Sequence, residues 1–354
     1  MTTTLTRTQP VIIVGVDAHQ QTHHACVVDA AGRKLADREF PATRAGYQAM
    51  IDWAAGLGQI DRFGIESTGS FAADLTRSVL AAGIEVIEVN RPDAALRRSH
   101  GKSDPIDAEA AARAVLSGRA TARPKATTGI VEAVRVLMVT RDSAVKARTA
   151  AYSQLRDLAT TAPAPIRETL LPLTSRARVR KAAGYRPDPA RLADPIHAAK
   201  LALRTLATRI QVLDQEIKTL TTQLTSLVEA TAPTLLALPQ IGPITAAQLL
   251  VTAGQNLDRF RSEAAFAKLT GTAPLPASSG KSRAMRINRG GDRQANKALH
   301  LIAIGRLKNH PATISYRQRR ETEGLSLRDI IRCLKRAIAR NVYQALRKDL
   351  LTTT

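Results

Sequence analysis

The chain has 354 residues, of which 44% are hydrophobic and 23% charged, so it is long enough and apolar enough to form two or three globular domains. Only 3% of the residues are aromatic, which argues against modules that stack bases on exposed Phe and Tyr side chains. The two cysteines, Cys26 and Cys333, provide neither a disulfide framework nor a CxxC metal motif.

The formal net charge is +22, and it is unevenly distributed. Residues 1–124 contain 14 Lys and Arg against 14 Asp and Glu, residues 125–255 contain 17 against 9, and residues 256–354 contain 21 against 7. Because cationic side chains that neutralise phosphates release counterions, we expect a nucleic-acid partner. The alternative is a basic surface that serves solubility alone.

The N-terminal sequence MTTTLTRTQP lacks the apolar core of a signal peptide, and no apolar run approaches the roughly 18 residues of a membrane span. We therefore expect a soluble, cytoplasmic protein.

The first 124 residues have the pattern of a mixed α/β domain. Strands are predicted at 11–17, twice within 24–40 around a turn at Gly32, at 62–68 and at 84–90, with helices at 43–57, at 70–83 and after residue 103. Three strands in a meander followed by alternating helices and strands is the order of a ribonuclease-H-like domain, so we assign residues 1–124 to that fold.

Residues 125–230 are predicted to be helical. Eight apolar residues follow a 3-4 spacing that is typical of a coiled-coil seam: Leu203, Leu206, Ile210, Leu213, Ile217, Leu220, Leu224 and Leu227. The partner of this seam is either the upstream helix, roughly 128–160, or another subunit. Prolines within 180–195 mark a break between the two helices.

Residues 231–354 are predicted to form a mostly helical C-terminal domain. The segment 237–254 resembles a helix-hairpin-helix, whose turn amides can face a phosphate backbone, although Gln240 occupies a position where that motif usually has glycine. A plain helix-turn-helix packing unit is the alternative. A loop and a basic strip follow within 269–311, and the amphipathic helix 325–346 carries five cations off its apolar face: Arg328, Arg332, Lys335, Arg336 and Arg340.

Four acids of the first domain fall where such a sheet would bring them together. Asp17 ends the first strand, Glu66 ends the fourth, and Asp104 and Asp107 lie three residues apart on one face of the following helix. Carboxylates from separate elements, together with substrate phosphates, are ligands that suit Mg²⁺, and bound cations cancel the repulsion between neighbouring acids. Two such ions can activate the attacking oxygen and stabilise the leaving oxygen of a phosphodiester.

Each of these acids also has an ordinary structural interpretation. An Asp after a strand commonly forms a turn, an acid in the first turn of a helix interacts with the helix dipole, and Ser103 fits a plain N-cap. Glu109 is a further acid, but its spacing places it on another face of the helix.

The motifs GVDAH, GIESTGS and KSDPIDAEAAAR resemble the DEDD motifs of a bacterial insertion-sequence transposase family, the insertion sequence 110/1111 type. The downstream stretch LTGTAPLPASSGKSRAMRINRGGDRQANKAL resembles the C-terminal transposase domain of that family. The resemblance implies a RuvC-like first domain in which Asp17, Glu66, Asp104 and Asp107 bind Mg²⁺, with Mn²⁺ as an alternative. It further implies a DNA recombinase guided by a structured bridge RNA, acting on donor and target DNA as dimers that pair into tetramers at the bacterial nucleoid.

The resemblance also implies a serine nucleophile that becomes covalently linked to DNA. The matching residue is Ser279, followed by Gly280, although the neighbouring Ser278 and Ser282 leave the register open. Cations near this loop would stabilise charge that develops on the phosphate; they are Lys281, Arg283, Arg286, Arg289 and Arg293. The segment Gly290-Gly291-Asp292-Arg293 matches a glycine-containing segment of the family that shapes the backbone near DNA.

Three other functions compete with this interpretation. A RuvC-like Holliday-junction endonuclease would use the same acids with water as the nucleophile, but it needs only the first domain. An actin-like sugar kinase shares the strand order but requires further glycine-rich phosphate loops. A non-catalytic nucleic-acid-binding protein explains the charge and leaves the four acids without a role.

Overall fold

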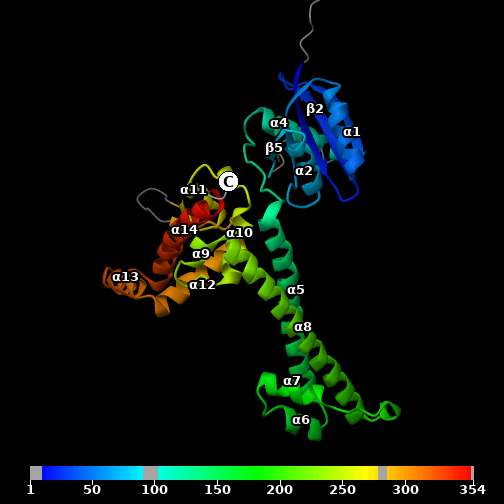
Figure 1. The fold of residues 1–354 in the computed structure, drawn as a ribbon, viewed down its shortest axis with the longest axis vertical. Helices are drawn as coiled ribbons and strands as arrows, with labels where there is room; N and C mark the ends of the chain where they lie inside the picture. Colours follow the sequence, from blue (N-terminus) through cyan, green and yellow to red (C-terminus); the bar gives the residue numbers. More distant parts are fainter. Residues whose placement is uncertain (1–9, 91–102, 278–284, 352–354) are drawn as a thin grey trace, which may run out of the picture. The chain divides into compact units, whose positions relative to one another are not determined.

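The computed structural model describes residues 10–90, 103–277 and 285–351, and it divides into two compact units. The first unit comprises Met1–Thr128 together with Gly254–Arg261, and the second comprises Gly129–Ala253 together with Ser262–Thr354. Figure 1 shows a sheet in the first unit and mostly helices in the second, which agrees with the predicted α/β region followed by helical regions.

The first unit is built on a five-stranded mixed sheet in the order β3-β2-β1-β4-β5. The antiparallel pairs are β1 with β2 and β2 with β3, whereas β4 runs parallel to both β1 and β5. The strands are β1 (Val11–Ala18), β2 (Thr22–Asp29), β3 (Lys34–Pro41), β4 (Gln59–Ile65) and β5 (Glu85–Glu88). The predicted turn between β2 and β3 contains Gly32, whose φ of 79° lies in the left-handed region that glycine adopts without strain.

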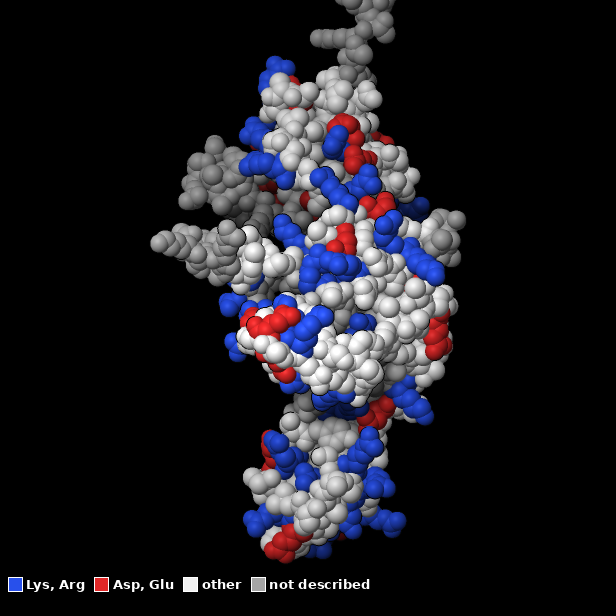
Figure 2. Space-filling view, turned by 90° about the vertical axis from the view of Figure 1, so that its left-hand side faces the viewer, with Lys and Arg blue, Asp and Glu red and all other residues white. Residues whose placement is uncertain are grey.

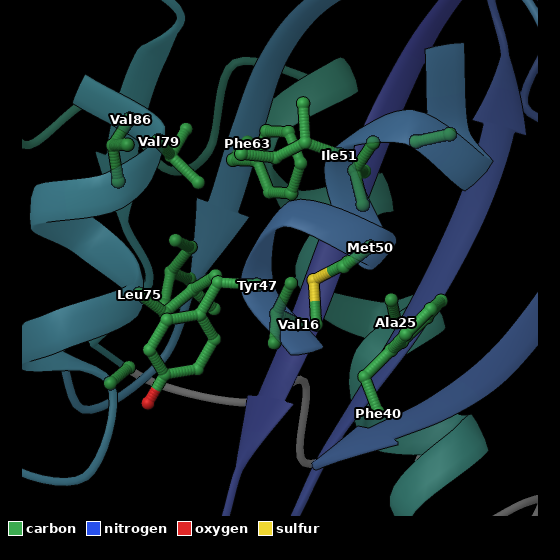
Figure 3. Packing of buried hydrophobic residues seen from close by; sticks show 14 of the residues in the cluster. Val16, Ala25, Phe40, Tyr47, Met50, Ile51, Phe63, Leu75, Val79 and Val86 are labelled. Carbon is green, nitrogen blue, oxygen red and sulfur yellow. The ribbon is translucent and has the colours of Figure 1, made fainter. Parts of the chain in front are cut away.

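Helices cover both faces of this sheet, so alternate residues of each strand enter different cores. Helices α1 (Arg44–Ala55) and α2 (Ala73–Ala81) pack on the face that carries Val16 and Phe63, as Figure 3 shows. Helix α4 (Asp104–Leu116) packs on the opposite face, which carries Ile13. Because side chains alternate along a strand, Gly15 and Asp17 follow Ile13 on the α4 face.

Helix α4 lies unusually close to the sheet because glycines face it. A Cβ atom on Gly15 would lie 2.0 Å from the carbonyl oxygen of Ala108, and one on Gly64 would lie 2.6 Å from a methyl group of Val115. Gly15 and Gly64 are paired neighbours on the parallel strands β1 and β4. The two glycines therefore leave space for the α4 backbone where any side chain would push it away.

We expect Gly15→Ala to destabilise the first unit by about 3 kcal/mol or more, because the new methyl group collides with backbone atoms of α4. Urea unfolding followed by fluorescence measures this effect within the first unit, because the chain contains one tryptophan and Trp53 lies in α1, packed on Phe40. Gly69→Ala is the matched control, since its Cβ would have no atom within 4 Å and should change stability by less than about 0.5 kcal/mol. Equal unfolding curves for both variants would contradict the close-contact argument.

His23 on β2 is buried beside α1. Its ring stacks on Tyr47 with the centroids 5.5 Å apart, and neither ring nitrogen makes a hydrogen bond to a residue within the described part of the chain. Burial lowers the pKa of His23 from 6.5, and the backbone of Thr22 opposes that shift. The folded unit therefore contains a neutral imidazole that resists protonation.

Because the pKa of His23 is lowered in the folded state, we expect the first unit to lose stability in mild acid. Below pH 6.5 the unfolded chain binds a proton at His23 that the folded state binds less readily, so the free energy of unfolding falls by up to about 1.4 kcal/mol per pH unit. His23→Phe retains a ring against Tyr47 and should flatten the loss between pH 7.5 and pH 5.5, measured by Trp53 fluorescence in urea. An unchanged slope in this variant would assign the acid sensitivity to other groups.

The second unit begins with a long helical hairpin. Helices α5 (Gly129–Thr161) and α8 (Pro195–Thr231) pack along each other, with α6 (Ala164–Leu170) and α7 (Ser175–Ala183) at the connecting end (Figure 1). Arg148 pairs with Asp214 at 2.8 Å and Arg141 donates to Thr221 at 2.9 Å. The earlier residue of α5 contacts the later residue of α8, so the two helices are antiparallel.

The hairpin shows where the heptad-spaced residues of α8 lie. One row is buried, namely Leu203, Ile210, Ile217 and Leu224, whereas Leu206, Leu213, Leu220 and Leu227 are half-buried. Leu203 and Ile210 share a core with Ala151 and Leu155 of α5. The upstream helix of the same chain, one of the two predicted partners, therefore packs against this seam.

The rest of the second unit is a small helical body with a two-stranded ribbon. Its elements are α9 (Pro233–Leu236), α10 (Pro243–Ala253), α11 (Glu263–Leu269), β6 (Pro274–Pro276), β7 (Met285–Ile287), α12 (Arg293–Asn309), α13 (Pro311–Thr322) and α14 (Leu327–Leu351). Strands β6 and β7 pair in antiparallel fashion.

The turn between α9 and α10 has the backbone conformation that explains the glycine preference noted in the sequence. Gln240 has a φ of 62°, in the left-handed region that glycine adopts without strain. The carbonyl of Pro239 accepts a 3.0 Å hydrogen bond from Arg306 of α12. This turn therefore packs against α12.

Within the described residues, no helix is long and apolar enough to cross a membrane. Cys26 and Cys333 are both free thiols.

Candidate active site

The carboxyl ends of the parallel strands β1 and β4 place two acids side by side. Val16 of β1 is the register partner of Ile65 of β4, and the amide of Glu66 donates to the carbonyl of Val16 at 3.2 Å. Asp17 lies two residues after Gly15, and Glu66 lies two residues after Gly64. Because residues two apart along a strand lie on the same face, each acid continues the face of the sheet on which α4 packs.

The loop after β4 is held in a fixed conformation. The sequence predicted a strand to residue 68, but β4 ends at Ile65, and Ser67 has a φ of 56°, which breaks the extended backbone. The buried hydroxyl of Thr68 donates a 2.7 Å hydrogen bond to Glu88 at the end of β5. These contacts fix the backbone immediately after Glu66.

Helix α4 brings the other two acids from the opposite side. Its N-cap is Ser103, as predicted, but the Ser103 side chain makes no capping hydrogen bond, and the amide of Asp107 donates to the Ser103 carbonyl instead. Asp104 and Asp107 lie one helical turn before Ala108 and Ala111, both buried against the sheet. The side chain of Asp104 is 45% exposed, whereas Asp107 is 2% exposed.

His19 connects the two groups of acids, although it was not among the site residues predicted from the sequence. Its Nε2 atom lies 3.3 Å from Oδ2 of Asp17 and 3.2 Å from Oδ1 of Asp104. Asp17 and His19 are two residues apart, a spacing that places both side chains on one face at the end of a strand. That spacing was the available signal in the sequence.

The electrostatic environment of Asp17 favours a bound cation. Burial is the largest effect, and it raises the pKa of the Asp17 carboxyl above 3.8; His19 opposes this shift, whereas the nearby Asp107 and Asp104 add to it. The side chain of Asp17 is 13% exposed. Asp17 is therefore a largely buried carboxylate with two further carboxylates nearby, an arrangement that a bound cation would stabilise.

The donor atoms of Asp17, His19 and Asp104 lie within 4.8 Å of one another, which is a spacing that one divalent ion can bridge. Asp107 and Glu66 are not part of this close group, but Asp107 is near enough to raise the pKa of Asp17, and Glu66 is fixed beside the end of β1. The residues present therefore fit a divalent metal. Glu109 turns away from them and pairs with Arg113 at 2.7 Å.

The predicted serine loop lies outside the described residues, and so do Ser278, Ser279, Lys281, Ser282 and Arg283. The described strands β6 and β7 flank this segment on its two sides.

The other predicted cations, Arg286, Arg289 and Arg293, are exposed. Arg286 lines a cavity of about 660 Å³ with Arg332 and Lys335 of α14, and Arg289 and Arg293 line a neighbouring one of about 600 Å³. Burial lowers the pKa of Lys335, which donates a hydrogen bond to Asn296. On the face drawn in Figure 2, Lys and Arg side chains are more widespread than Asp and Glu side chains.

The glycine-containing segment after the basic strip has a structural role in the second unit. A Cβ atom on Gly291 would lie 2.5 Å from the amide nitrogen of Gly271, so the two chain segments touch there through their backbones. Asp292 caps α12 by accepting from the amides of Gln294 and Ala295, and it also accepts a 2.8 Å hydrogen bond from Thr252. These contacts fix the start of α12 beside Arg293.

Comparisons with known proteins match both halves of the chain. The family model DEDD_Tnp_IS110, described as a transposase, matches residues 14–162, and a model described as the transposase IS116/IS110/IS902 family matches residues 232–318.

Three relatives match most of the chain. The insertion element IS110 uncharacterized 43.6 kDa protein of Streptomyces coelicolor is 27% identical over 361 residues, 88% of each chain. The insertion element IS900 uncharacterized 42 kDa protein of Mycobacterium paratuberculosis is 26% identical over 386 residues, 95% of each chain. The mini-circle putative transposase for IS117 of Streptomyces coelicolor is 24% identical over 365 residues, 88% of each chain.

The two models match the α/β region with its acids and the later helical region in the order that the sequence predicted. The chain therefore belongs to the IS110-type DEDD transposases, a family of enzymes that act on DNA.

Proposed function

We propose that this protein is the recombinase of an insertion sequence, and that it cuts and rejoins DNA strands with metal-binding carboxylates and a serine nucleophile. The observation that carries the proposal is the meeting of Asp17 and Asp104, from elements far apart in the sequence, within one group of potential metal ligands. Asp107 and Glu66 adjoin that group from α4 and from the end of β4.

The first unit has, in this proposal, a ribonuclease-H-like and RuvC-like fold. The support is the sheet order β3-β2-β1-β4-β5, in which the central strand β1 pairs with antiparallel β2 on one side and with parallel β4 on the other. The candidate site lies at the carboxyl ends of the parallel strands, where open α/β sheets bind their ligands.

Asp17, Glu66, Asp104 and Asp107 would hold Mg²⁺, or Mn²⁺ in its place. Such an ion stabilises the charge that develops on a reacting phosphodiester. The Asp17 carboxylate already lies near those of Asp104 and Asp107. Metal binding would therefore require no large movement of α4. Thr68 fixes the loop that carries Glu66 by its hydrogen bond to Glu88.

Ser279 would attack the phosphorus and form a phosphoserine ester while a deoxyribose oxygen leaves. Support comes from the family resemblance and from the cations on the described flank of the loop, Arg286, Arg289 and Arg293, whose exposure leaves them accessible to a phosphate strand. Lys281 and Arg283 would add to this positive environment. The acids and the serine would both act in the same strand-transfer reaction.

The partners in this proposal are donor DNA, target DNA and a structured bridge RNA. The charge excess of the C-terminal two-thirds supports binding of polyanions. In homodimers that pair into tetramers, at the nucleoid in the bacterial cytoplasm, the half-buried row of α8 would contribute the coiled-coil contact between subunits.

We expect Asp104→Asn to reduce strand cleavage more than about a hundredfold, because it removes a charged ligand from the group while leaving the side-chain volume unchanged. The measurement is gel-based cleavage of element-junction DNA by the protein purified with its co-purifying RNA. Glu109→Gln is the matched control on the same helix, since Glu109 pairs with Arg113 and Lys34 and should remain active. Normal recombination by Asp104→Asn would refute the carboxylate assignment.

The serine is tested separately by trapping the protein–DNA adduct under denaturing conditions. Ser279→Ala should abolish the adduct, whereas Ser278→Ala and Ser282→Ala should retain it. An adduct that survives Ser279→Ala would assign the nucleophile to another residue. Metal-dependent cleavage with no adduct in the unsubstituted protein would favour a resolvase that uses water.

A further inference from the structure

His19 occupies a position that differs from an ordinary ion pair. Its Nε2 atom faces two carboxylates from different elements, at 3.3 Å from Asp17 and 3.2 Å from Asp104, and its side chain is 51% exposed. His24 on β2 provides the contrast, because it makes a single 2.7 Å contact with Asp37. The imidazole of His19 is thus one corner of a triangle of potential metal donors.

We propose that Nε2 of His19 is a direct ligand of the divalent cation at this site, so that the donor set contains one nitrogen beside the carboxylate oxygens. The proposal rests on the metal-dependent function above, and it adds a ligand that the four-acid motif does not contain.

The spacing of the donor atoms supports this assignment. Neighbouring ligands of an octahedral ion with bonds of about 2.1 Å lie about 3.0 Å apart. The two His19 distances exceed that value by 0.2 to 0.3 Å, and all three donor atoms lie within 4.8 Å of one another. Shifts of a few tenths of an ångström would therefore place all three on one ion.

A nitrogen ligand changes which metal the site prefers. Carboxylate, carbonyl and water ligands suit Mg²⁺ and Ca²⁺, whereas imidazole suits transition metals. Among these, affinity for a given site generally rises from Mn²⁺ to Co²⁺. A site with His19 as a ligand is therefore expected to bind Mn²⁺ and Co²⁺ more tightly than Mg²⁺, and to owe much of that difference to the imidazole.

The test is direct detection of a metal–nitrogen bond in the full-length chain. Mn²⁺ is bound to the protein at a substoichiometric ratio, and pulsed electron paramagnetic resonance measures the coupling of the ion to nearby nitrogen nuclei. We expect a ¹⁴N coupling that changes to a ¹⁵N coupling in protein labelled with ¹⁵N-histidine. His19→Gln should remove the coupling and weaken Mn²⁺ binding about tenfold or more, with a smaller effect on Mg²⁺.

Three comparisons make the outcome decisive. His24→Gln should retain both the coupling and the affinity, and Trp53 fluorescence in urea should show that the His19→Gln chain remains folded. Bound Mn²⁺ that requires Asp17 and Asp104 but shows no histidine coupling would overturn the role of His19 and leave the proposed function intact. Failure of Mn²⁺ to bind the unsubstituted chain at all would overturn both.

Discussion

Helix α4 can approach strands β1 and β4 only because Gly15 and Gly64 leave no side chain between its backbone and the sheet. The same two strands end, two residues later, in Asp17 and Glu66, so one contact sets both the packing of the helix and the meeting of the acids. The remaining two carboxylates lie on α4 one turn before the small residues of that helix that touch the sheet. The absence of side chains at Gly15 and Gly64 thus sets the distance between α4 and the sheet. The same close packing brings the acids near enough to repel one another.

Much of the first unit could be predicted from its sequence, because each strand carries a local signal. Runs of β-branched residues, a glycine turn and amphipathic helices indicated the five strands and their succession along the chain without any knowledge of distant contacts. The acids could be placed at strand ends for the same reason. The end of β4 was predicted three residues too late, since the left-handed Ser67 has no counterpart in hydrophobic patterning.

Features that depend on a partner segment could not be predicted in the same way. A heptad spacing reveals that a stripe is apolar but not which neighbour it meets; the second row of α8 stays half-buried because α5 covers mainly the first. His19 was overlooked for a related reason, since its importance comes from the proximity of Asp104, which only the folding of α4 onto β1 creates. Gln240 is intermediate: the sequence showed a glycine-like position, and the structure shows the left-handed backbone that explains it.

The segment Gly254–Arg261 belongs to the first unit although about 125 residues of the second unit precede it in the chain. Its Asn256 side chain donates to the carbonyl of Pro124 and accepts from the amide of Ala126, and Leu257 is buried. A ribosome delivers the N-terminal residues first, so the contacts of Asn256 with Pro124 and Ala126 form only after residues 129–253 have been synthesised. The early translation product therefore passes through a stage in which the first unit lacks one of its segments, and a fragment that ended at residue 128 would lack that segment altogether.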